Sequence, residues 1–266
     1  MTASVPAYVS RGTGDTAVVM LHGVGGGKEA WVPQLDAIAA AGYLAVAWDA
    51  PGYGGSAAVV PYDMTGLAVA LERLVDQLAA KRCVLMGHSM GGMIAQEALV
   101  RFPAKIQGVV LSATSPAFGK ADGEWQRSFL AQRLDPLDAG RTMADLAPGL
   151  VAGFVGSDAD AAGILRAIDV MSGVPPQTYR AALRAIVAFD RRSDLGSIGV
   201  PAFVLAGERD TTAPPQVMSR MAERMPDATF AVLAGCGHLS NLERPAAYNA
   251  AVLHWLNEKF SPSRRH

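Results

Sequence analysis

Hydrophobic residues in this 266-residue chain fall into short unbroken runs, separated by longer stretches in which apolar and polar positions alternate with helical spacing. The runs are rich in Val, Leu and Ala, which is typical of strands buried on both faces of a parallel sheet. Six runs predict strands, at residues 17–21, 43–48, 83–86, 108–112, 201–206 and 229–233. Before residue 17 only residues 7–11 offer a further strand, so we expect the first edge of the sheet to be short.

The stretches between these runs predict helices. Leu67, Leu71, Leu74 and Leu78 recur at helical spacing within residues 65–80, as expected for a helix with one buried face. Further helices are predicted at residues 31–41, 93–101 and 245–260. Strands that alternate with helices indicate an α/β protein with a mostly parallel sheet and helices on both faces.

Residues 116–197 break this alternation, since they contain scattered large apolar residues but no convincing strand. We interpret them as a helical cap (lid) inserted into a core made of residues 1–115 and 198–266, and lying over the strand ends. Trp125 and Phe129 are candidates for walls of a substrate pocket. The alternative is that such residues pack within the cap itself, which we expect for most of them.

Composition narrows the classes of function. The 23 basic and 24 acidic residues give a formal charge of −1, so nothing favours nucleic-acid binding. Two cysteines form no disulfide framework or metal cluster, as is common in cytosolic proteins. No signal peptide is evident, and the longest apolar run, residues 37–48, is shorter than the roughly 20 residues of a membrane span. We therefore expect a soluble cytoplasmic protein; the sequence leaves its oligomeric state open.

A Gly-x-Ser-x-Gly pattern at residues 87–91 connects a predicted strand directly to a predicted helix. By composition alone such a pattern is expected in about one chain of this kind in six. The strand–turn–helix context is more specific, because it presents one hydroxyl, that of Ser89, on a tight turn at the edge of the sheet. Ser89 is the candidate nucleophile.

A serine needs a base to take its proton and a carboxylate to orient that base. Among five histidines, His238 follows the last strand in a glycine-flanked loop, whereas His22 and His88 are expected to brace turns. Asp210 follows the preceding strand and is the leading acid. Glu208 is its nearest rival, and Asp49 is expected to cap backbone amides in a turn.

Attack by a serine on a carbonyl also creates an oxyanion, which two backbone N–H groups can stabilise. We expect one from Met90, the residue after the nucleophile, and one from Val24, in the glycine-rich loop after the first long strand. This chemistry requires no metal or organic cofactor, and the sequence shows no ligand cluster for either.

Together these motifs resemble those of the α/β-hydrolase fold family over nearly the whole chain. They are His22-Gly23, residues 49–56, residues 87–92, residues 207–210 and residues 237–245. The order Ser89, Asp210, His238 is the family's order. Serine at the turn differs from the dehalogenase and epoxide-hydrolase branches, and residues 238–243 are similar to those of small carboxylesterases and enol-lactonases. The resemblance implies a serine hydrolase that cleaves a carboxylic ester or lactone through an acyl-enzyme. The large apolar residues of the cap suggest a medium-sized, largely apolar acyl or alcohol group.

Three alternatives remain. A carbon–carbon bond hydrolase for ring-cleavage products would share the triad order but typically has Asn where this chain has His88. A small-ligand receptor could keep the same fold and residues without turnover. A nucleotide site at residues 25–30, with Asp49 some 20 residues later, fits a degenerate glycine motif. The nucleotide-site hypothesis gives no role to Ser89, Asp210 and His238.

Overall fold

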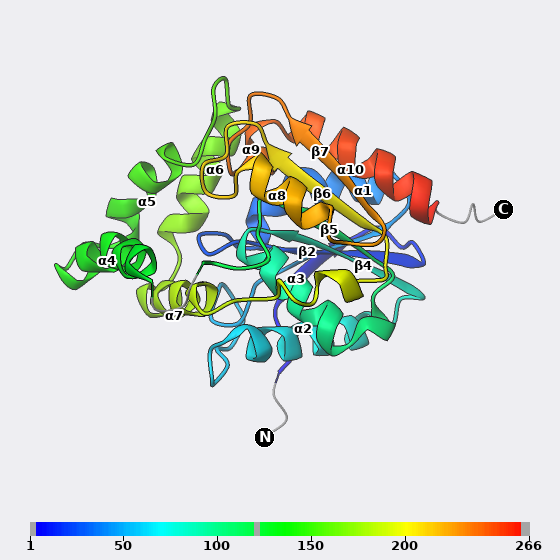
Figure 1. Ribbon diagram of the computed structural model, residues 1–266, viewed down its shortest axis with the longest axis horizontal. Coiled ribbons are helices and arrows are strands. Elements are labelled where there is room, and N and C mark those ends of the chain that lie inside the picture. Colours follow the sequence, from blue (N-terminus) through cyan, green and yellow to red (C-terminus); the bar gives the residue numbers. More distant parts are fainter. Residues whose placement is uncertain (1–3, 120–122, 262–266) are drawn as a thin grey trace.

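A twisted sheet of seven strands forms the centre of the computed structural model, which describes residues 4–119 and 123–261 (Figure 1). The strands are β1 Tyr8–Arg11, β2 Thr16–Leu21, β3 Leu44–Trp48, β4 Arg82–His88, β5 Gly108–Ser112, β6 Ala202–Gly207 and β7 Ala228–Leu233. Their order is β1-β3-β2-β4-β5-β6-β7, with only β1 antiparallel to its neighbour. The mostly parallel sheet and each strand predicted from the hydrophobic runs are confirmed.

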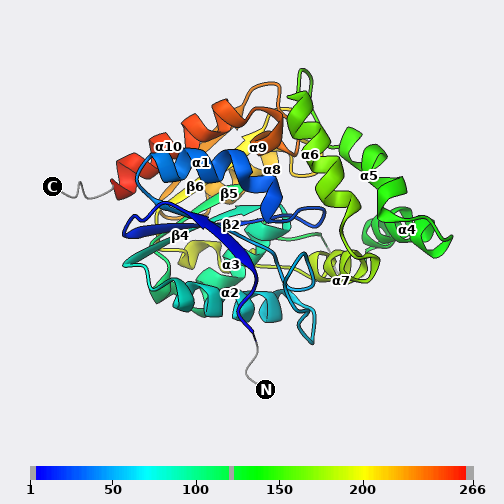
Figure 2. The same cartoon turned by 180° about the vertical axis from the view of Figure 1, so that it is seen from behind.

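Helices cover both faces of this sheet. The helices α1 (Val32–Ala40) and α10 (Pro245–Phe260) pack side by side on one face (Figure 2). The helices α2 (Met64–Leu78), α3 (Met90–Arg101) and α8 (Pro215–Ala222) cover the other. Alternate residues of β2 point to opposite faces: Val19 packs with the second group, and Val18 with the first. This period of two explains why the central strands are apolar at every position.

Local sequence sets where several helices begin and end. Asp63 precedes α2 and accepts a hydrogen bond from the Gly66 N–H at 2.7 Å, which satisfies a donor that the helix leaves free. Pro245 occupies the first turn of α10, where its missing N–H costs nothing. The helix after the serine turn starts at Met90, three residues earlier than the predicted start at residue 93.

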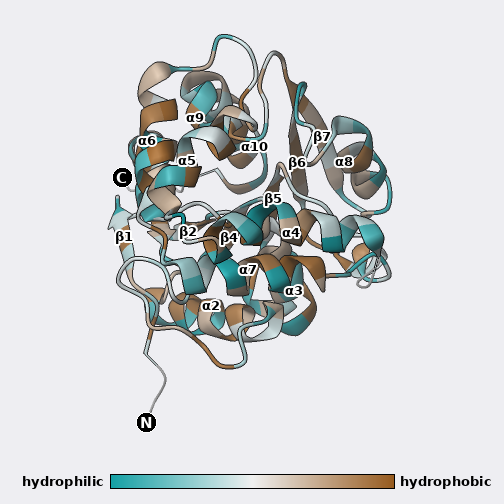
Figure 3. Cartoon of the chain, turned by 90° about the vertical axis from the view of Figure 1, so that its left-hand side faces the viewer, coloured by the Kyte–Doolittle hydropathy of each residue, from teal (hydrophilic) through white to brown (hydrophobic). Residues whose placement is uncertain are grey.

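Four helices fill the region between β5 and β6, and Figure 3 looks onto them. They are α4 Glu124–Asp138, α5 Met143–Ala152, α6 Ala161–Ser172 and α7 Pro176–Val187. In Figure 3 hydrophobic and hydrophilic segments alternate along these helices, as expected for helices with one buried side. Shorter helical turns are η1 Lys28–Trp31, η2 Pro103–Lys105, η3 Leu195–Ser197 and α9 Ser240–Glu243.

Of these helices, α6 and α7 lie nearest the loops that follow the parallel strands, and α4 and α5 lie farther out (Figure 1). The Thr178 hydroxyl in α7 donates to the Gly52 carbonyl at 2.9 Å, and α6 packs on η1 and α9. At the far end of the segment, Arg191 forms an ion pair of 2.6 Å with the buried Glu97 of α3. We propose that residues 116–197 are a cap domain, attached at the strand ends where parallel α/β sheets bind their ligands.

No helix in the described ranges combines the length and apolar character needed to cross a membrane.

Candidate active site

Ser89 lies on the turn between β4 and α3, in a backbone conformation with φ 53° and ψ −117°. A non-glycine residue at positive φ is strained, typically by about 1–3 kcal/mol, and requires support from its surroundings. The Ser89 N–H donates to the Ser112 carbonyl at 3.0 Å, and the Ser89 carbonyl accepts from the Thr114 hydroxyl at 2.8 Å. The end of the neighbouring strand β5 and the segment directly after it therefore hold the turn in place.

Glycine is required beside Ser89 because backbone atoms approach too closely for a side chain. A Cβ atom at Gly91 would lie 2.0 Å from the Leu21 carbonyl oxygen, and one at Gly87 would lie 2.4 Å from the Gly91 carbonyl oxygen. Both distances are far below van der Waals contact. The serine turn is thus fixed mainly by close packing of backbone against backbone.

His238 and Asp210 meet in the loops that follow β7 and β6. The His238 Nδ1–H donates to Asp210 Oδ2 at 2.8 Å, and both residues are buried. The other carboxylate oxygen, Oδ1, accepts from the backbone N–H groups of Thr212 and Ala213 at 2.7 and 2.9 Å. Glu208, the rival acid, is exposed and instead accepts from the Gly235 N–H.

Burial by itself raises the pKa of Asp210, but the hydrogen bonds from His238, Ala213 and Thr212 outweigh it and hold the pKa below its usual value. The carboxylate is therefore ionised at neutral pH. An ionised carboxylate at Nδ1 fixes which imidazole nitrogen carries the proton and leaves Nε2 as the basic nitrogen.

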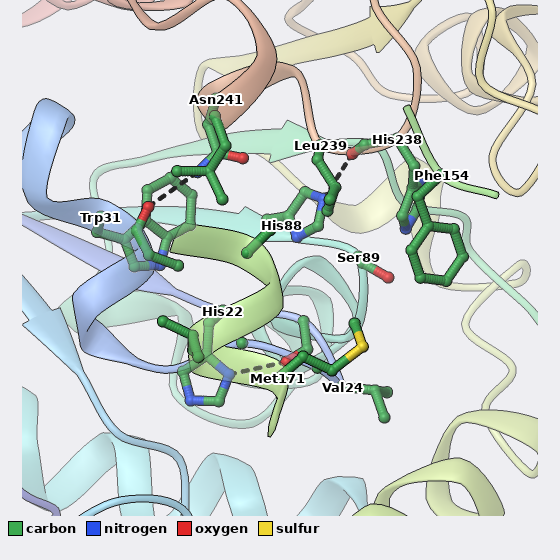
Figure 4. Close-up of a pocket in the computed structure, with 17 residues that line it drawn as sticks. His22, Val24, Trp31, His88, Ser89, Phe154, Met171, His238, Leu239 and Asn241 are labelled. Atoms are coloured by element: carbon green, nitrogen blue, oxygen red, sulfur yellow. Dashed lines mark hydrogen bonds between the residues drawn. The ribbon is translucent and has the colours of Figure 1, made fainter. Parts of the chain in front are cut away.

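The backbone around His238 is held by residues from distant parts of the chain. Its N–H donates to the Phe154 carbonyl of the cap at 2.6 Å, and its carbonyl accepts from His88 Nε2–H at 2.7 Å (Figure 4). The Phe154 ring also lies 5.4 Å from the imidazole. His88, predicted to brace its own turn, thus supports the loop of His238.

Glu243 strengthens this loop and is a residue whose role the sequence did not reveal. Its buried carboxylate accepts from the N–H groups of Gly237 and Leu239, on either side of His238, at 2.8 and 2.9 Å. It also accepts from the Gly156 N–H of the cap at 2.7 Å. A buried carboxylate needs such partners. In the sequence Glu243 is visible only as an acid five residues after His238. A local pattern cannot predict that it also contacts Gly156 of the cap.

His22 joins two loops at the edge of the site. Its Nδ1–H donates to the Gly23 carbonyl at 2.8 Å, while its Nε2 accepts from the Ala50 N–H at 2.9 Å. Burial lowers the pKa of His22, and burial together with the nearby His238 lowers that of His88 to about 3. Both imidazoles are neutral at pH 7.

Asp49 is structural, in line with the turn-capping role expected of it. Its carboxylate accepts from the N–H groups of Lys28 and Gly55 and forms an ion pair of 2.6 Å with the Lys28 ammonium. Burial raises the pKa of Asp49, yet these partners outweigh it and keep the pKa below its usual value. This pairing occupies the acid that the nucleotide hypothesis would need for a ribose.

Val24 and Met90, the residues predicted to supply oxyanion donors, both line a cavity beside Ser89. The Val24 loop approaches the serine closely, since a Cβ atom at Gly23 would lie 3.1 Å from the Ser89 Cβ. In the part of the chain that the structure describes, neither the Val24 N–H nor the Met90 N–H donates to another residue. Both donors are therefore available to a ligand.

Two cavities of about 80 and 70 Å³ meet at the serine. Six residues line both: Val24, Gly25, Ser89, Phe154, Met171 and His238. The first cavity extends toward His22, Trp31 and Asn241, and the second extends between α4 and α7. Figure 4 shows the Ser89 hydroxyl and the His238 imidazole directed into the same space. The walls are mainly apolar, which suits an organic substrate.

The two aromatic residues predicted as pocket walls differ in position. Phe129 lines the second cavity, as expected. Trp125 is 61% exposed and stacks on Phe129 at 5.7 Å, one turn nearer the start of α4. It borders an outer depression together with Phe118 and Thr211 rather than either cavity at Ser89. Both residues lie on the same face of one helix, four residues apart, so their position along the helix axis decides which one reaches the cavity.

This arrangement can perform nucleophilic catalysis. A serine hydroxyl shares a cavity with an imidazole whose Nδ1 is bound to an ionised carboxylate, and two unpaired N–H groups adjoin the same space. These are the parts needed to form and stabilise a tetrahedral intermediate at a carbonyl carbon.

Comparison with known proteins agrees with the fold. Residues 18–251 match the model of the family described as "Alpha/beta hydrolase family". A putative carbamate hydrolase RutD from Variovorax paradoxus is 29% identical over 92% of this chain and 93% of that protein. A pimeloyl-[acyl-carrier protein] methyl ester esterase from Nitrosospira multiformis is 27% identical over 77% and 81%. The enol-lactonase structure from Burkholderia xenovorans has a TM-score of 0.82 at 25% identity, covering 94% of this chain and 96% of that one.

Proposed function

Because this chain belongs to the alpha/beta hydrolase family, we propose that it is a serine hydrolase that cleaves a small carboxylic ester or lactone. The observation that carries the proposal is the buried His238–Asp210 hydrogen bond of 2.8 Å beside cavities that Ser89 also lines. Relatives named as an esterase and an enol-lactonase support this class of substrate.

In the proposed reaction, His238 Nε2 takes the proton of Ser89 as the Ser89 oxygen attacks the carbonyl carbon. Asp210 stabilises the resulting imidazolium and keeps its orientation. The Val24 and Met90 N–H groups bind the oxyanion, and Met90 lies at the start of α3, where the helix dipole favours negative charge. The protonated His238 then gives its proton to the leaving alcohol or enol, and water attacks the acyl-enzyme to release the acid.

The size of the cavities supports a small substrate. Each is about 70–80 Å³ and open on one side, so a small group fits inside and a larger one would extend out of the opening. We propose that one cavity takes the acyl group and the other the leaving group. This is smaller than the medium-sized apolar group that the large residues of the cap sequence suggest.

The decisive test is turnover of short-chain p-nitrophenyl esters by the wild-type protein and by Ser89→Ala. We expect the wild type to release p-nitrophenol steadily, and the variant to lose at least about four orders of magnitude in kcat because no nucleophile remains. Circular dichroism spectra of the two proteins should coincide.

Two results would contradict the proposal. Equal rates for the two proteins would show that Ser89 is not the nucleophile. No turnover of any ester or lactone by a correctly folded wild type would favour the receptor alternative.

Carbamates are a second candidate class, supported by the relative named as a putative carbamate hydrolase. The same serine could attack a carbamate carbonyl through the same tetrahedral geometry. An activity panel should therefore include carbamates next to esters and lactones of equal chain length, with the ratio of kcat/KM values deciding the preferred class.

A further inference from the structure

A guanidinium group lines the second cavity, in which most other walls are apolar. Arg133 on α4 is half-buried and borders both this cavity and the outer depression beyond it. Phe118, Phe129 and Thr212 border the same two spaces. Arg133 therefore lies where the cavity at Ser89 opens toward the surface of the cap.

The charge of Arg133 has no acidic partner in the described part of the chain. Its contacts are a hydrogen bond of 3.3 Å to the Phe129 carbonyl and a cation–π contact of 3.7 Å with the Phe129 ring. Three other arginines of the same segment, Arg180, Arg191 and Arg192, each pair with a carboxylate. Arg141, Arg166 and Arg184 also pair with no carboxylate among the described residues, but Arg133 differs from them in lining a cavity that Ser89 also lines.

Leaving a partly buried guanidinium without an anion is unfavourable, because its charge loses water and gains no opposite charge in return. Burial lowers the pKa of Arg133 from its ordinary value, in accord with this cost. The group nevertheless stays charged, since an arginine does not lose its proton under physiological conditions. A ligand that brings a negative charge would remove the penalty.

The site is also held ready for such a ligand. Stacking on Phe129 fixes the plane of the guanidinium, so little side-chain entropy is lost when an anion binds. Tyr179 lines the same cavity, and the positive charge of Arg133 is near enough to act against the rise that burial causes in the pKa of Tyr179. The phenolic hydroxyl of Tyr179 can therefore serve as a second hydrogen-bond donor to a ligand at Arg133. A fixed guanidinium next to a hydroxyl matches the two oxygens of a carboxylate.

Resting on the proposed function, we propose that the preferred substrate is an anionic ester or lactone whose free carboxylate binds Arg133 while its carbonyl carbon reaches Ser89. The two residues line one cavity of about 70 Å³, so the chain between the carboxylate and the reacting carbonyl is short. Arg133 is then a specificity-determining residue, and the product of hydrolysis is a dicarboxylic acid.

The test compares each half-ester with its neutral amide. Monomethyl succinate, glutarate and adipate are assayed beside the matching monomethyl monoamides, which have nearly the same shape but no charge. We expect the wild type to favour the best half-ester over its amide by about tenfold to a hundredfold in kcat/KM, as charge-assisted hydrogen bonds allow. Arg133→Gln should remove that preference by slowing the half-ester and leaving the amide within about threefold.

Two control variants separate binding from folding. Arg184→Gln replaces an exposed arginine of α7 that lines neither cavity, and should leave both rates unchanged. Arg133→Lys keeps the charge but not the planar fork, and should retain part of the preference. An equal fall of both substrates in Arg133→Gln would mean a merely structural role and would overturn the inference.

Failure of this inference is distinguishable from failure of the proposed function. If Ser89-dependent turnover of neutral esters occurs without any preference for half-esters, the inference is wrong and the hydrolase proposal stands. If no ester or lactone is turned over, calorimetric titration with glutarate still decides: binding to the wild type that Arg133→Gln abolishes supports the carboxylate site, and equal or absent binding refutes it.

Discussion

The turn of Ser89 and the loop of His238 lie on the same edge of the sheet but are held by different forces. The serine turn is fixed by backbone packing, with Gly91 pressed against the carbonyl of Leu21. The histidine loop is fixed by hydrogen bonds with Phe154 and His88, which are far away in sequence, and with Glu243, five residues after His238.

This difference has a mechanical consequence. Close packing is rigid and tolerates almost no change of shape. A hydrogen-bonded loop can be loosened by a single substitution without loss of the fold, since each bond contributes only about 0.5–1.5 kcal/mol net. We therefore expect changes in the turn to alter the stability of the whole protein, and changes in the loop to alter the rate first.

Gly91→Ala is expected to have the largest effect on stability. A Cβ atom 2.0 Å from the Leu21 carbonyl oxygen forces β2 and α3 apart, at a cost of about 3 kcal/mol or more. Urea unfolding at pH 7 measures this change. The matched control is Gly149→Ala in α5, where a Cβ atom meets nothing within 4 Å; it should be neutral or stabilise by up to about 1 kcal/mol. Equal effects at the two sites would contradict the packing argument.

Glu243→Gln is expected to lower kcat strongly while the protein remains folded. The amide keeps one acceptor but directs an NH₂ group toward backbone donors, which loosens the loop on both sides of His238. We expect kcat to fall by about tenfold to a hundredfold through misplacement of the imidazole, with a loss of about 2 kcal/mol in the free energy of unfolding.

The control for that change is Glu208→Gln, because Glu208 is exposed and accepts from one N–H of the same region. Its kcat should stay within about twofold of the wild type, given that single exposed contacts contribute little. A Glu243→Gln enzyme with unchanged kcat would refute the positioning role of Glu243.

The effect that develops most gradually is a loss of stability in acid. His22 and His88 have folded-state pKa values below the ordinary value of 6.5 because they are buried. The unfolded chain therefore binds more protons, and stability falls as the pH drops from about 6.5 toward the folded value of about 3 for His88. The slope is about 1.4 kcal/mol per pH unit for each histidine.

Urea midpoints between pH 7 and pH 5 measure this slope, and His88→Gln should reduce it by roughly one histidine's share. Gly149→Ala, which adds a methyl group on α5 and removes no titratable group, should leave it unchanged. A slope that does not respond to His88→Gln would show that His88 is not the buried neutral group responsible.

Much of the site could be predicted because its parts leave local marks. Glycines on both sides of Ser89, and turns at the ends of apolar runs, identify strand ends where Asp210 and His238 also lie. Such local marks do not separate Glu208 from Asp210, since both follow β6 within three residues. Only the three-dimensional course of the loop directs Asp210 toward His238 and Glu208 toward Gly235.

The sequence by itself determined the strands, the faces of the helices and the serine turn, because hydrophobic period and glycine sterics act between neighbours in the chain. The tertiary structure alone decided which cap residues face the cavity and what holds the histidine. Trp125 and Phe129 share a helix, yet one is exposed and the other lines the cavity. Glu243 gains its significance from the Gly156 N–H, which only folding brings into reach. Arg133 gains its significance from its place beside the cavity of Ser89, with no acidic partner among the described residues.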